Sequence, residues 1–389
     1  MRLRLACAAA AAASALLLGG PAAAAPSTLV SAGNGTCRDV AFTYDTEFGE
    51  ITPTLAATLE DLNIRATFFF VGDSVDDHAD LVKRLAVRHQ VANHTWSHPF
   101  MAQLSPDEMR QELLLAEERI TAVAGQSPQP FWRPPYGNYD DTVLEAAGEL
   151  GYAYTIYWSM DTVDWAGPSA EVIRERLVAG AFPGGIALMH GSPLATPDGT
   201  WLAAGDLRAL GYQFVTVSEI LGLDRHLRDF GGDAYIVQPG DDMARVAGCH
   251  NVTAARLLAY NEIDSPPAGT VLAIPHTTEV VVRLDGERIS FPVWPRIVDA
   301  RTVAHVRLAE RLGAAVEWDG ERVHVVSGAT ELIVTPGERM ALVNGAPADM
   351  GTAAIMEANR VLVPVRFLAE RLGWSVGWDS ETWTVSISG

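Results

Sequence analysis

The stretch "VAFTY" at residues 40–44 opens the pattern that decides the fold of the first half of the chain. A helix-like "TPTLAATLEDLNI" follows at 52–64, then an apolar "ATFFFVG" at 66–72 and a second helix-like "ADLVKRLAVRH" at 79–89. Apolar runs that alternate with helical segments are typical of a parallel sheet whose strands are joined by helices. The sequence therefore predicts an α/β domain over residues 38–225, with a parallel sheet or barrel.

A capped helix strengthens this prediction. The segment "SPDEMRQELLLAEERITAVAG" at 105–125 begins with Ser105 and places Glu108 three residues later, which is the pattern of a capping box. Gly125 is suited to end the helix, because glycine adopts the left-handed conformation that follows many helices.

The composition limits the partners of the chain. Its 389 residues exceed the usual size of one hydrophobic core, so two or three domains are expected. The formal net charge of −20 argues against nucleic acid and against anionic membrane surfaces as partners. Nothing in the sequence indicates the oligomeric state.

The first 25 residues, "MRLRLACAAAAAASALLLGGPAAAA", combine a basic start, an apolar stretch and a small-residue ending suited to cleavage after Ala25. They predict a signal peptide at 1–25 and a secreted or extracytoplasmic, cell-wall-associated protein with no membrane span after its removal. The mature chain then keeps Cys37 and Cys249 in an oxidising compartment where a disulfide is permitted. The two cysteines fall in different apparent domains, so whether they pair stays open.

Two further segments follow. Residues 234–275 have the pattern of a short strand, two helices, a Pro/Gly turn and a final strand, which indicates a small separate module. Residues 280–389 contain a repeat, because "LAERLGAAVEWDGERVHVV" at 308–326 recurs as "LAERLGWSVGWDSETWTVS" at 368–386. The pattern of each copy predicts a helix that ends at the glycine of "RLG", followed by two strands joined by a tight turn.

Residues able to carry chemistry gather in the first half. "NHTWSHP" at 93–99 spaces His94 and His98 four apart, which on a helical turn brings both imidazoles to one face, within reach of one cation. In "FWRPPYGNY" at 131–139, two prolines stiffen the segment that holds Arg133. Taken alone, these patterns also fit two ordinary polar histidines and a structural turn.

Carboxylates and a third histidine complete the set. Asp45 ends an apolar run, "WSMDTVDWAG" at 158–167 carries Asp164, and His190 ends the run "IALMHGS". The carboxyl ends of parallel strands meet at one edge, where the active sites of α/β proteins are built. We expect these side chains to lie together there.

Five strings of the sequence resemble the motifs of NodB-type polysaccharide deacetylases of carbohydrate esterase family 4. They are "TYDT" (43–46), "HTWSH" (94–98), "RPPYG" (133–137), "DTVDW" (161–165) and "LMH" (188–190). The resemblance implies a distorted (β/α) barrel with fewer strands than the regular eight. It also implies a hydrolase that removes acetyl groups from sugars.

The resemblance assigns roles around a divalent metal, with zinc favoured. Asp45 would be the general base, oriented by Arg133, and His94 and His98 would be metal ligands. Hydrolysis of an amide needs an activated water, which a bound metal and a base supply together.

The remaining motif residues would complete the reaction. The backbone N–H of Tyr136 would bind the oxyanion, and His190 would be the general acid held by Asp164. Trp165 and Leu188 would shape the acetyl pocket.

The stretch "TYDT" departs from the family, which usually has two consecutive aspartates there, the second being a metal ligand. Here that position is Thr46, and a neutral hydroxyl is a poor ligand for a divalent ion beside a carboxylate. Glu47 reaches the metal only if the strand has given way to a loop, because consecutive strand residues point to opposite faces. A metal held by two histidines and water, a third ligand in Glu47, and a weakened or absent metal all stay open.

The two later segments also resemble known modules. "YIVQPGDD" at 235–242 and "AGTVLAIP" at 268–275 are similar to the opening and the close of a LysM module, which implies binding to glycans that contain N-acetylglucosamine. The stretch "VLVPVRFLAERLGWSVGWDSETWTVSI" at 361–387 is similar to the stalk-like N-terminal domain of copper amine oxidases. The segment has no cluster of histidine and cysteine, so no copper is expected.

These observations predict a secreted, metal-dependent N-deacetylase of cell-wall glycan, with peptidoglycan as the favoured substrate. The alternatives are a deacetylase of chitin oligomers, an O-acetyl esterase of the xylan type, and a cell-wall binding protein weakened in catalysis by Thr46.

Overall fold

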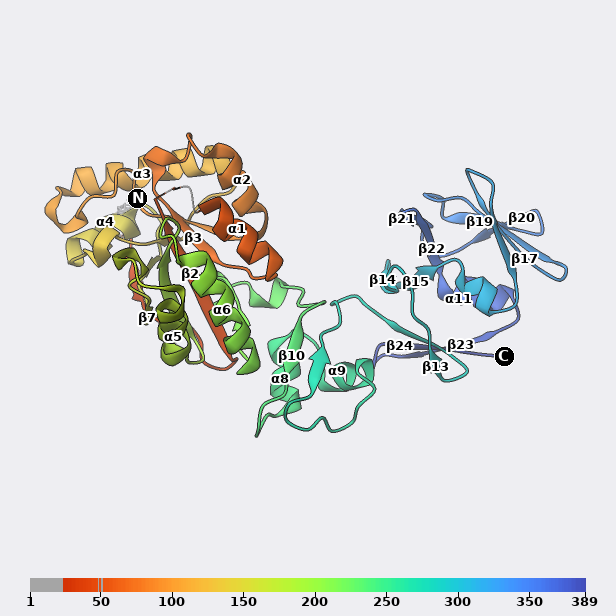
Figure 1. Cartoon of the computed structure of the whole chain (residues 1–389). Coiled ribbons are helices and arrows are strands. Elements are labelled where there is room, and N and C mark those ends of the chain that lie inside the picture. Colours follow the sequence, from red (N-terminus) through yellow and green to blue (C-terminus); the bar gives the residue numbers. More distant parts are fainter. Residues whose placement is uncertain (1–23, 48, 50–51) are drawn as a thin grey trace, which may run out of the picture. The chain divides into compact units, whose positions relative to one another are not determined.

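In a computed structural model of the chain, which describes residues 24–47, 49 and 52–389, the strands of the first half form one nine-stranded sheet (Figure 1). Its strands are β1 (Thr28–Val30), β2 (Asp39–Thr46), β3 (Thr67–Phe70), β4 (Gln90–Asn93), β5 (Phe131–Trp132), β6 (Tyr154–Ile156), β7 (Met160–Asp161), β8 (Gly185–His190) and β9 (Gln213–Phe214). Neighbours pair in parallel, with Asp45 of β2 opposite Phe69 of β3. The predicted parallel α/β fold is confirmed.

The strand order is β1-β6-β5-β4-β3-β2-β8-β7, with β9 also paired to β2. β1 and β7 lie at the two ends of this order, so the described sheet is an open, incomplete barrel. The expectation of fewer than eight strands was wrong. β5, β7 and β9 have two residues each, which is too short for a pattern of alternating residues to reveal them.

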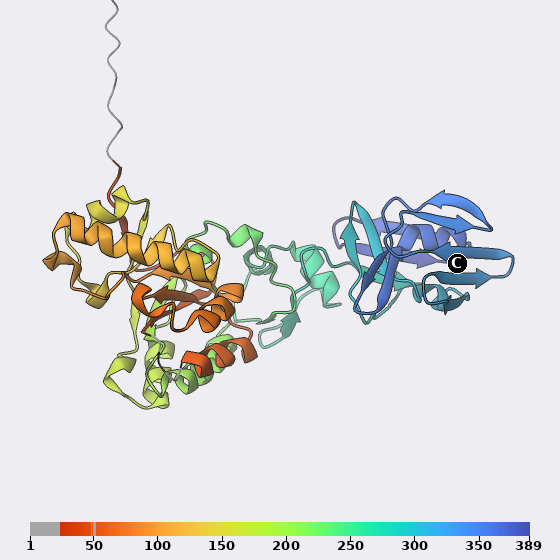
Figure 2. The same cartoon turned by 90° about the horizontal axis from the view of Figure 1, so that it is seen from above.

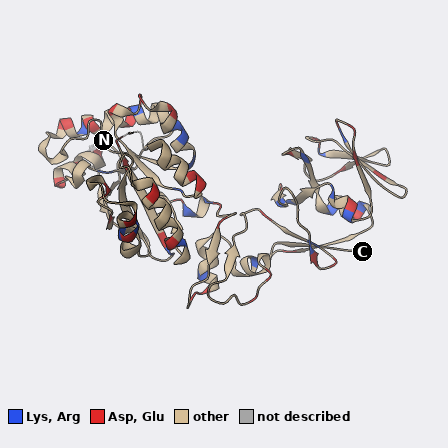
Figure 3. Cartoon of the chain, in the orientation of Figure 1, with Lys and Arg blue, Asp and Glu red and all other residues tan. Residues whose placement is uncertain are grey.

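Helices connect the strands, as the alternating pattern predicted. They are α1 (Thr52–Asp61), α2 (Ala79–Arg88), α3 (Pro106–Ala124), α4 (Asp141–Glu149), α5 (Ala170–Gly180), α6 (Thr196–Ala209) and α7 (Val217–Ile220). Figures 1 and 2 show α1 to α4 around the outside of the strands they connect. Charged residues lie mainly on the helices, whereas the strands are largely uncharged (Figure 3).

Local signals in the sequence account for these elements. β2 is buried along its whole length, and the three phenylalanines 68–70 of β3 are fully buried, which explains their continuous apolar runs. Ser105 and Glu108 form the predicted capping box at the start of α3, and Gly125 ends that helix in the left-handed conformation.

The predicted signal peptide lies outside the described residues, apart from its last two positions. Among the described residues, no helix combines the length and the apolar character needed to span a membrane. Cys37 and Cys249, whose pairing the sequence left open, form a disulfide across 212 residues of sequence.

The small module follows its predicted order. It consists of β10 (Ala234–Ile236), α8 (Met243–Cys249), α9 (Ala254–Tyr260) and β11 (Val271–Ala273). β10 and β11 pair antiparallel. Its own buried cluster includes Tyr235, Leu257 and Leu272, which explains how so short a segment forms a core.

The C-terminal domain consists of three sheets and two helices. The first sheet is formed by β13 (Glu287–Arg288), β12 (Val281–Leu284), β24 (Thr384–Ser388) and β23 (Ser375–Asp379). The second is formed by β14 (Arg296–Val298), β15 (Arg301–His305), β22 (Arg360–Pro364) and β21 (Ile355–Glu357). The third is formed by β16 (Ala315–Trp318), β17 (Val323–Ser327), β18 (Thr330–Val334), β19 (Met340–Val343) and β20 (Ala346–Asp349).

The predicted repeat is confirmed in this domain. Helix α10 (Leu308–Arg311) precedes the hairpin β16–β17, and α11 (Val365–Arg371) precedes the hairpin β23–β24. Both copies contribute to a single buried core, which includes Leu308 of the first copy and Leu368 of the second. The two copies therefore pack on each other.

Candidate active site

The sheet brings the predicted residues to the carboxyl ends of its strands. Asp45 is the next-to-last residue of β2, His94 follows β4, Arg133 follows β5 and His190 ends β8. Asp164 begins a short 3₁₀ turn at Asp164–Ala166, after β7. The expectation that these side chains share one edge is confirmed.

Asp45 and Arg133 form a buried ion pair. The Arg133 Nη1–H group donates to Asp45 Oδ1 over 2.6 Å. Arg133 is fully buried and also donates to the Ile156 carbonyl at 3.0 Å and to Thr43 Oγ1 at 2.8 Å. Its guanidinium lies 4.1 Å from the centre of the Phe69 ring. These contacts hold the arginine, and with it the carboxylate, in one orientation.

The surroundings keep Asp45 ionised. Burial raises the pKa of its carboxyl, but the charge of Arg133, together with His94 and His190, outweighs burial. The pKa of Asp45 consequently lies below its usual value. At neutral pH this side chain is a carboxylate able to accept a proton.

His94 and His98 lie on a loop and not on a helical turn, which corrects the expectation from their spacing. The loop follows β4, and Thr95 and His98 adopt positive φ angles of 69° and 59°. The two rings nevertheless lie together, with centroids 4.9 Å apart. Left-handed residues turn the loop back on itself, and this replaces the helical turn.

Both imidazoles favour the neutral form. The His94 Nδ1–H group donates to the Arg133 carbonyl at 2.8 Å, which leaves Nε2 with its lone pair 3.4 Å from Asp45 Oδ2. Burial lowers the pKa of His94 to about 4 and also lowers that of His98. Neutral imidazoles are the form that binds metal.

Thr46 does not take the place of a carboxylate ligand at the site. Thr46 is fully buried, and its hydroxyl donates to the Tyr44 carbonyl of its own strand at 3.4 Å. Glu47 lies just beyond the end of β2, with its side chain 66% exposed and its Oε1 3.6 Å from His98 Nδ1. Within the described ranges, no three His, Cys, Asp or Glu side chains converge as a metal cluster.

His190 and Asp164 form the second buried pair. The His190 Nδ1–H group donates to Asp164 Oδ1 and the His190 backbone N–H to Oδ2, each over 2.8 Å. Burial lowers the pKa of His190, but the hydrogen bond to Asp164 and the charge of Asp45 outweigh it and raise that pKa above its usual value. His190 is therefore suited to donate a proton.

Aromatic side chains border the site. Tyr136, at a positive φ of 61°, is 60% exposed and stacks on Phe100 with centroids 4.1 Å apart. Trp165 is 67% exposed, whereas Leu188 is buried in β8. Exposed rings beside a catalytic edge suit the flat faces of sugars.

Three supporting residues escaped the sequence analysis. Thr43 accepts from Arg133, and the Thr196 hydroxyl donates to Asp164 Oδ2 at 2.7 Å. Glu112 of α3 accepts from the backbone N–H groups of Trp96 and Ser97 at 2.9 and 2.8 Å, and so holds the loop between the two histidines. Thr43 lies within the motif "TYDT", which was a signal, but the other two lie in unrelated segments.

Comparison with known proteins places these features in families. Residues 32–155 match the model of the polysaccharide deacetylase family, 235–275 that of the LysM domain, and 283–387 that of the copper amine oxidase N-terminal domain. The three predicted resemblances are confirmed.

Characterised relatives are similar to the first half of the chain. A peptidoglycan-N-acetylglucosamine deacetylase of Bacillus cereus is 36% identical over 185 residues, which are 46% of this chain and 66% of that protein. The peptidoglycan-N-acetylglucosamine deacetylase PgdA of Listeria monocytogenes is 35% identical over 189 residues, which are 48% of this chain and 40% of that protein. The chain thus spans less than two thirds of either relative.

A solved structure is similar over the same region. It is the crystal structure of the Bc1960 peptidoglycan N-acetylglucosamine deacetylase, with 32% sequence identity and a TM-score of 0.48, over 50% of this chain and 92% of that chain. By its family-model matches, the chain contains a polysaccharide deacetylase domain, which is followed in the sequence by a LysM domain and a copper amine oxidase N-terminal domain.

Proposed function

We propose that residues 38–225 form a metal-dependent polysaccharide N-deacetylase. The observation that carries this proposal is the presence of two buried, hydrogen-bonded pairs on one sheet edge, Asp45 with Arg133 and His190 with Asp164. One pair keeps a carboxylate ionised, and the other raises the pKa of an imidazole, which favours its protonated form. Amide hydrolysis needs both a base and an acid, whereas glycan binding alone needs neither.

The chain's own residues account for each proton transfer. The Asp45 carboxylate takes a proton from the attacking water, whose oxygen bonds to the acetyl carbonyl carbon. The Tyr136 backbone N–H stabilises the charge that develops on the carbonyl oxygen. Protonated His190 gives its proton to the amide nitrogen as the C–N bond breaks, and acetate and a free amine leave. Asp164 binds the Nδ1 proton, which leaves Nε2 to act as the acid.

The donor set fits a metal held by two imidazoles. His94 and His98 would be the ligands, and the bond from His94 Nδ1 to the Arg133 carbonyl is the outer contact that metal-binding histidines usually make. A divalent cation such as zinc would supply positive charge that makes a bound water more acidic.

We assign Glu47 as the third ligand, in place of the aspartate that Thr46 displaces. Two observations support it: β2 ends at Thr46, so Glu47 is free of the strand's alternation, and its carboxylate already lies beside His98. Because Glu47 is largely exposed, it would bind the metal more loosely than a buried carboxylate.

Peptidoglycan is the substrate that we favour. The relatives described above are named as peptidoglycan deacetylases, and a LysM domain beside the catalytic domain would raise the local concentration of polymer. The same features support an extracytoplasmic location at the cell wall. The exposed rings of Tyr136 and Trp165 offer surfaces for sugar faces at the site.

Acetate release from peptidoglycan, N-acetylated chito-oligomers and acetylated xylan tests the proposal. Asp45→Asn should reduce release from the N-acetylated substrates by roughly 10²- to 10⁴-fold, the usual contribution of a general base. Asp80→Asn is the matched control, because Asp80 is an exposed residue of α2. This variant should release acetate at the wild-type rate.

Each other outcome decides against a part of the proposal. Preferred cleavage of acetylated xylan would make the protein an O-acetyl esterase. Preferred cleavage of chito-oligomers would indicate that the substrate is chitin and not peptidoglycan. Binding of peptidoglycan without release of acetate by the wild type would make it a binding protein.

A further inference from the structure

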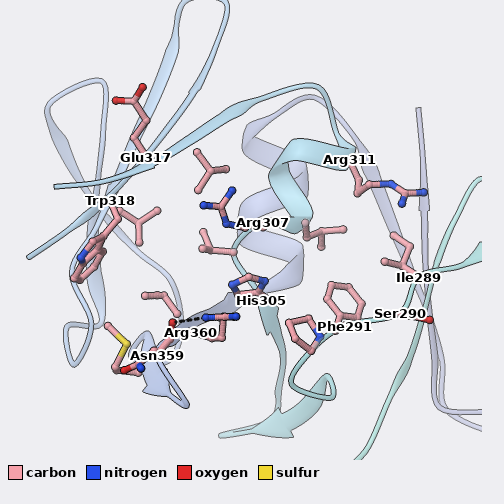
Figure 4. A pocket seen from close by; sticks show the side chains of 17 residues that line it. Ile289, Ser290, Phe291, His305, Arg307, Arg311, Glu317, Trp318, Asn359 and Arg360 are labelled. Carbon is pink, nitrogen blue, oxygen red and sulfur yellow. Dashed lines mark hydrogen bonds between the residues drawn. The ribbon is translucent and has the colours of Figure 1, made fainter. Parts of the chain in front are cut away.

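Two features of the described residues have no role in the deacetylase proposal. One is a cavity of about 820 Å³ in the C-terminal domain. There Arg311 points away from Arg360 and Trp318, so the charged and aromatic groups do not converge on one ligand (Figure 4). The other is the hydrogen bonding of the loop that joins His94 to His98. In this loop, polar groups from several elements do converge.

Side chains hold both ends of this loop. The Thr95 N–H group donates to Asn93 Oδ1 at 2.7 Å, and Asn93 is the buried last residue of β4. The His98 N–H group donates to Thr95 Oγ1 at 3.2 Å. Thr95 and His98 both have positive φ angles, which cost free energy in residues with a β-carbon. These bonds therefore stabilise the turn that brings the two imidazoles together.

Glu112 of α3 holds the middle of the loop. Its Oε2 accepts from the backbone N–H groups of Trp96 and Ser97, at 2.9 and 2.8 Å. Its Oε1 accepts from the Ser97 hydroxyl at 2.8 Å. One half-buried carboxylate thus makes three hydrogen bonds to two residues that lie between the histidines.

A second element binds the carbonyl groups of the loop. It is a 3₁₀ turn at Gly72–Ser74, which follows β3. The Gly72 N–H group donates to the Thr95 carbonyl at 2.9 Å, and the next N–H group donates to the Trp96 carbonyl at 3.0 Å. A β-carbon at Gly72 would lie 2.7 Å from the backbone of α3 and 2.8 Å from the Trp96 ring, so only glycine allows this close approach.

The chain's own groups are therefore sufficient to order the loop. The positions of His94 and His98 follow from hydrogen bonds within the protein and do not depend on a bound ion. A loop that became ordered only on binding would lose conformational entropy, which weakens affinity. This saving matters more where Thr46 replaces the usual aspartate, because the imidazoles then contribute a larger share of the binding.

We propose that Glu112 is a positioning residue of the metal site, which sets the metal affinity by holding the loop between the two histidines. It acts through its hydrogen bonds and not through its negative charge. A glutamine in the same place keeps one oxygen for the N–H groups of Trp96 and Ser97, and its amide N–H can donate to the Ser97 hydroxyl. This inference rests on the proposed metal-dependent function.

Calorimetric titration of the full chain with zinc tests the proposal. Glu112→Ala preserves the helix, because alanine favours helices, but removes all three bonds to the loop. Its zinc affinity should fall by about tenfold or more, as when other residues that orient metal ligands are lost. Glu112→Gln should stay within about threefold of the wild type, since only a screened charge is lost.

Glu108→Ala is the matched control in the same helix. Glu108 also accepts from a serine, through the Ser105 backbone N–H at 2.8 Å and the Ser105 hydroxyl at 2.7 Å. These bonds cap the start of α3 and do not involve residues 94–98. Both alanine variants should lower the melting temperature, but Glu108→Ala should change the zinc affinity less than about twofold.

Amide hydrogen exchange of the metal-free chain supplies a readout that needs neither metal nor activity. The N–H groups of Trp96 and Ser97 should be protected in the wild type and in Glu112→Gln, because their acceptor is present. They should exchange faster in Glu112→Ala, whereas Glu108→Ala should leave them protected.

Several results would overturn the proposal. They are an unchanged zinc affinity in Glu112→Ala, an equal loss in Glu112→Gln or in Glu108→Ala, and unprotected Trp96 and Ser97 amides in the wild type. A wild type that protects these amides but binds no zinc would contradict the proposed metal dependence instead. The affinities of the Glu112 variants would then be compared in Thr46→Asp, which restores the usual aspartate.

Discussion

The site has two proposed sides, which differ in how firmly their groups are held. The acid–base side comprises Asp45, Arg133, Asp164 and His190, and the metal side comprises His94, His98 and Glu47. Asp45, Arg133 and Asp164 are buried and joined to their partners by hydrogen bonds of 2.6 to 2.8 Å. On the metal side, Glu47 is largely exposed and lies 3.6 Å from His98. Short hydrogen bonds thus hold the proposed acid and base. They also hold His94, through the Arg133 carbonyl, whereas the proposed third metal ligand, Glu47, has no such bond.

This difference indicates which residues of the site can be substituted without loss of activity. Removing one member of a buried pair leaves a charge without water or partner, so the proton-transfer residues are tightly constrained. On the proposed metal side, Thr46 stands where the family usually has an aspartate, and water would complete the coordination of a bound metal there. We therefore expect activity that persists but depends strongly on free metal.

Among these changes, Arg133→Gln should cause the largest loss of stability, because it removes one member of the buried Asp45–Arg133 pair. It leaves Asp45 buried without its cation, which should lower the free energy of unfolding by about 3–5 kcal/mol. Arg84→Gln is the control, because it opens a solvent-exposed pair with Glu60 and should cost about 0–1 kcal/mol. Chemical unfolding measures both, and equal losses would contradict the contrast between the two pairs.

The same variant has a kinetic consequence. Without Arg133, burial raises the pKa of Asp45, so the base becomes ionised only at higher pH. The acidic limb of the plot of kcat/KM against pH should therefore move to higher pH.

Asp164→Asn should come next. It removes the hydrogen bond and the charge that raise the pKa of His190, and acetate release should fall by roughly 10²- to 10⁴-fold. His190 is protonated below its raised pKa and loses its proton as the pH rises through it, so the basic limb of the profile should move to lower pH. Asp161→Asn, in the same motif but exposed, serves as the control, and an equal shift there would remove Asp164 from its role.

Changes at residues 46 and 47 sharpen the comparison on the metal side. Thr46→Asp should tighten zinc binding, and Glu47→Gln should weaken it. Each change should be at least about tenfold, since even outer carboxylates alter metal affinity by roughly 10- to 100-fold. Calorimetry measures the affinity independently of activity. Unchanged affinity in Glu47→Gln would leave two histidines and water as the ligands.

Chelator sensitivity follows from the same loose site. Dialysis against chelator should strip the metal from the wild type and leave more of it in Thr46→Asp. Zinc retained by the wild type after prolonged dialysis would show that the metal side is as firm as the acid–base side.

Proton release should show the smallest effect. His94 has a pKa of about 4, so at pH 6 it is already neutral and has no proton to lose when metal binds. Titration with zinc in buffers of different ionisation enthalpy should therefore detect less than one proton released for this residue. Release of a full proton from each histidine would contradict the assigned state.

Local patterns were sufficient to predict much of this protein. The alternation of strands and helices, the capping box at Ser105 and the repeat at 308–386 each depend on neighbouring residues, so the sequence reveals them directly. The site residues Asp45, Arg133 and His190 were predictable because parallel strands place their carboxyl ends at one edge.

Contacts between distant segments were decided by the tertiary structure alone. The sequence by itself determined the fold class, the three kinds of domain and the chemical types in the site. It could not place Glu112 under the histidine loop, Thr196 on Asp164, or Cys37 against Cys249. Those contacts join residues in distant segments, which no repeating pattern of the sequence links. Only the packing of helices on strands sets the distances between them.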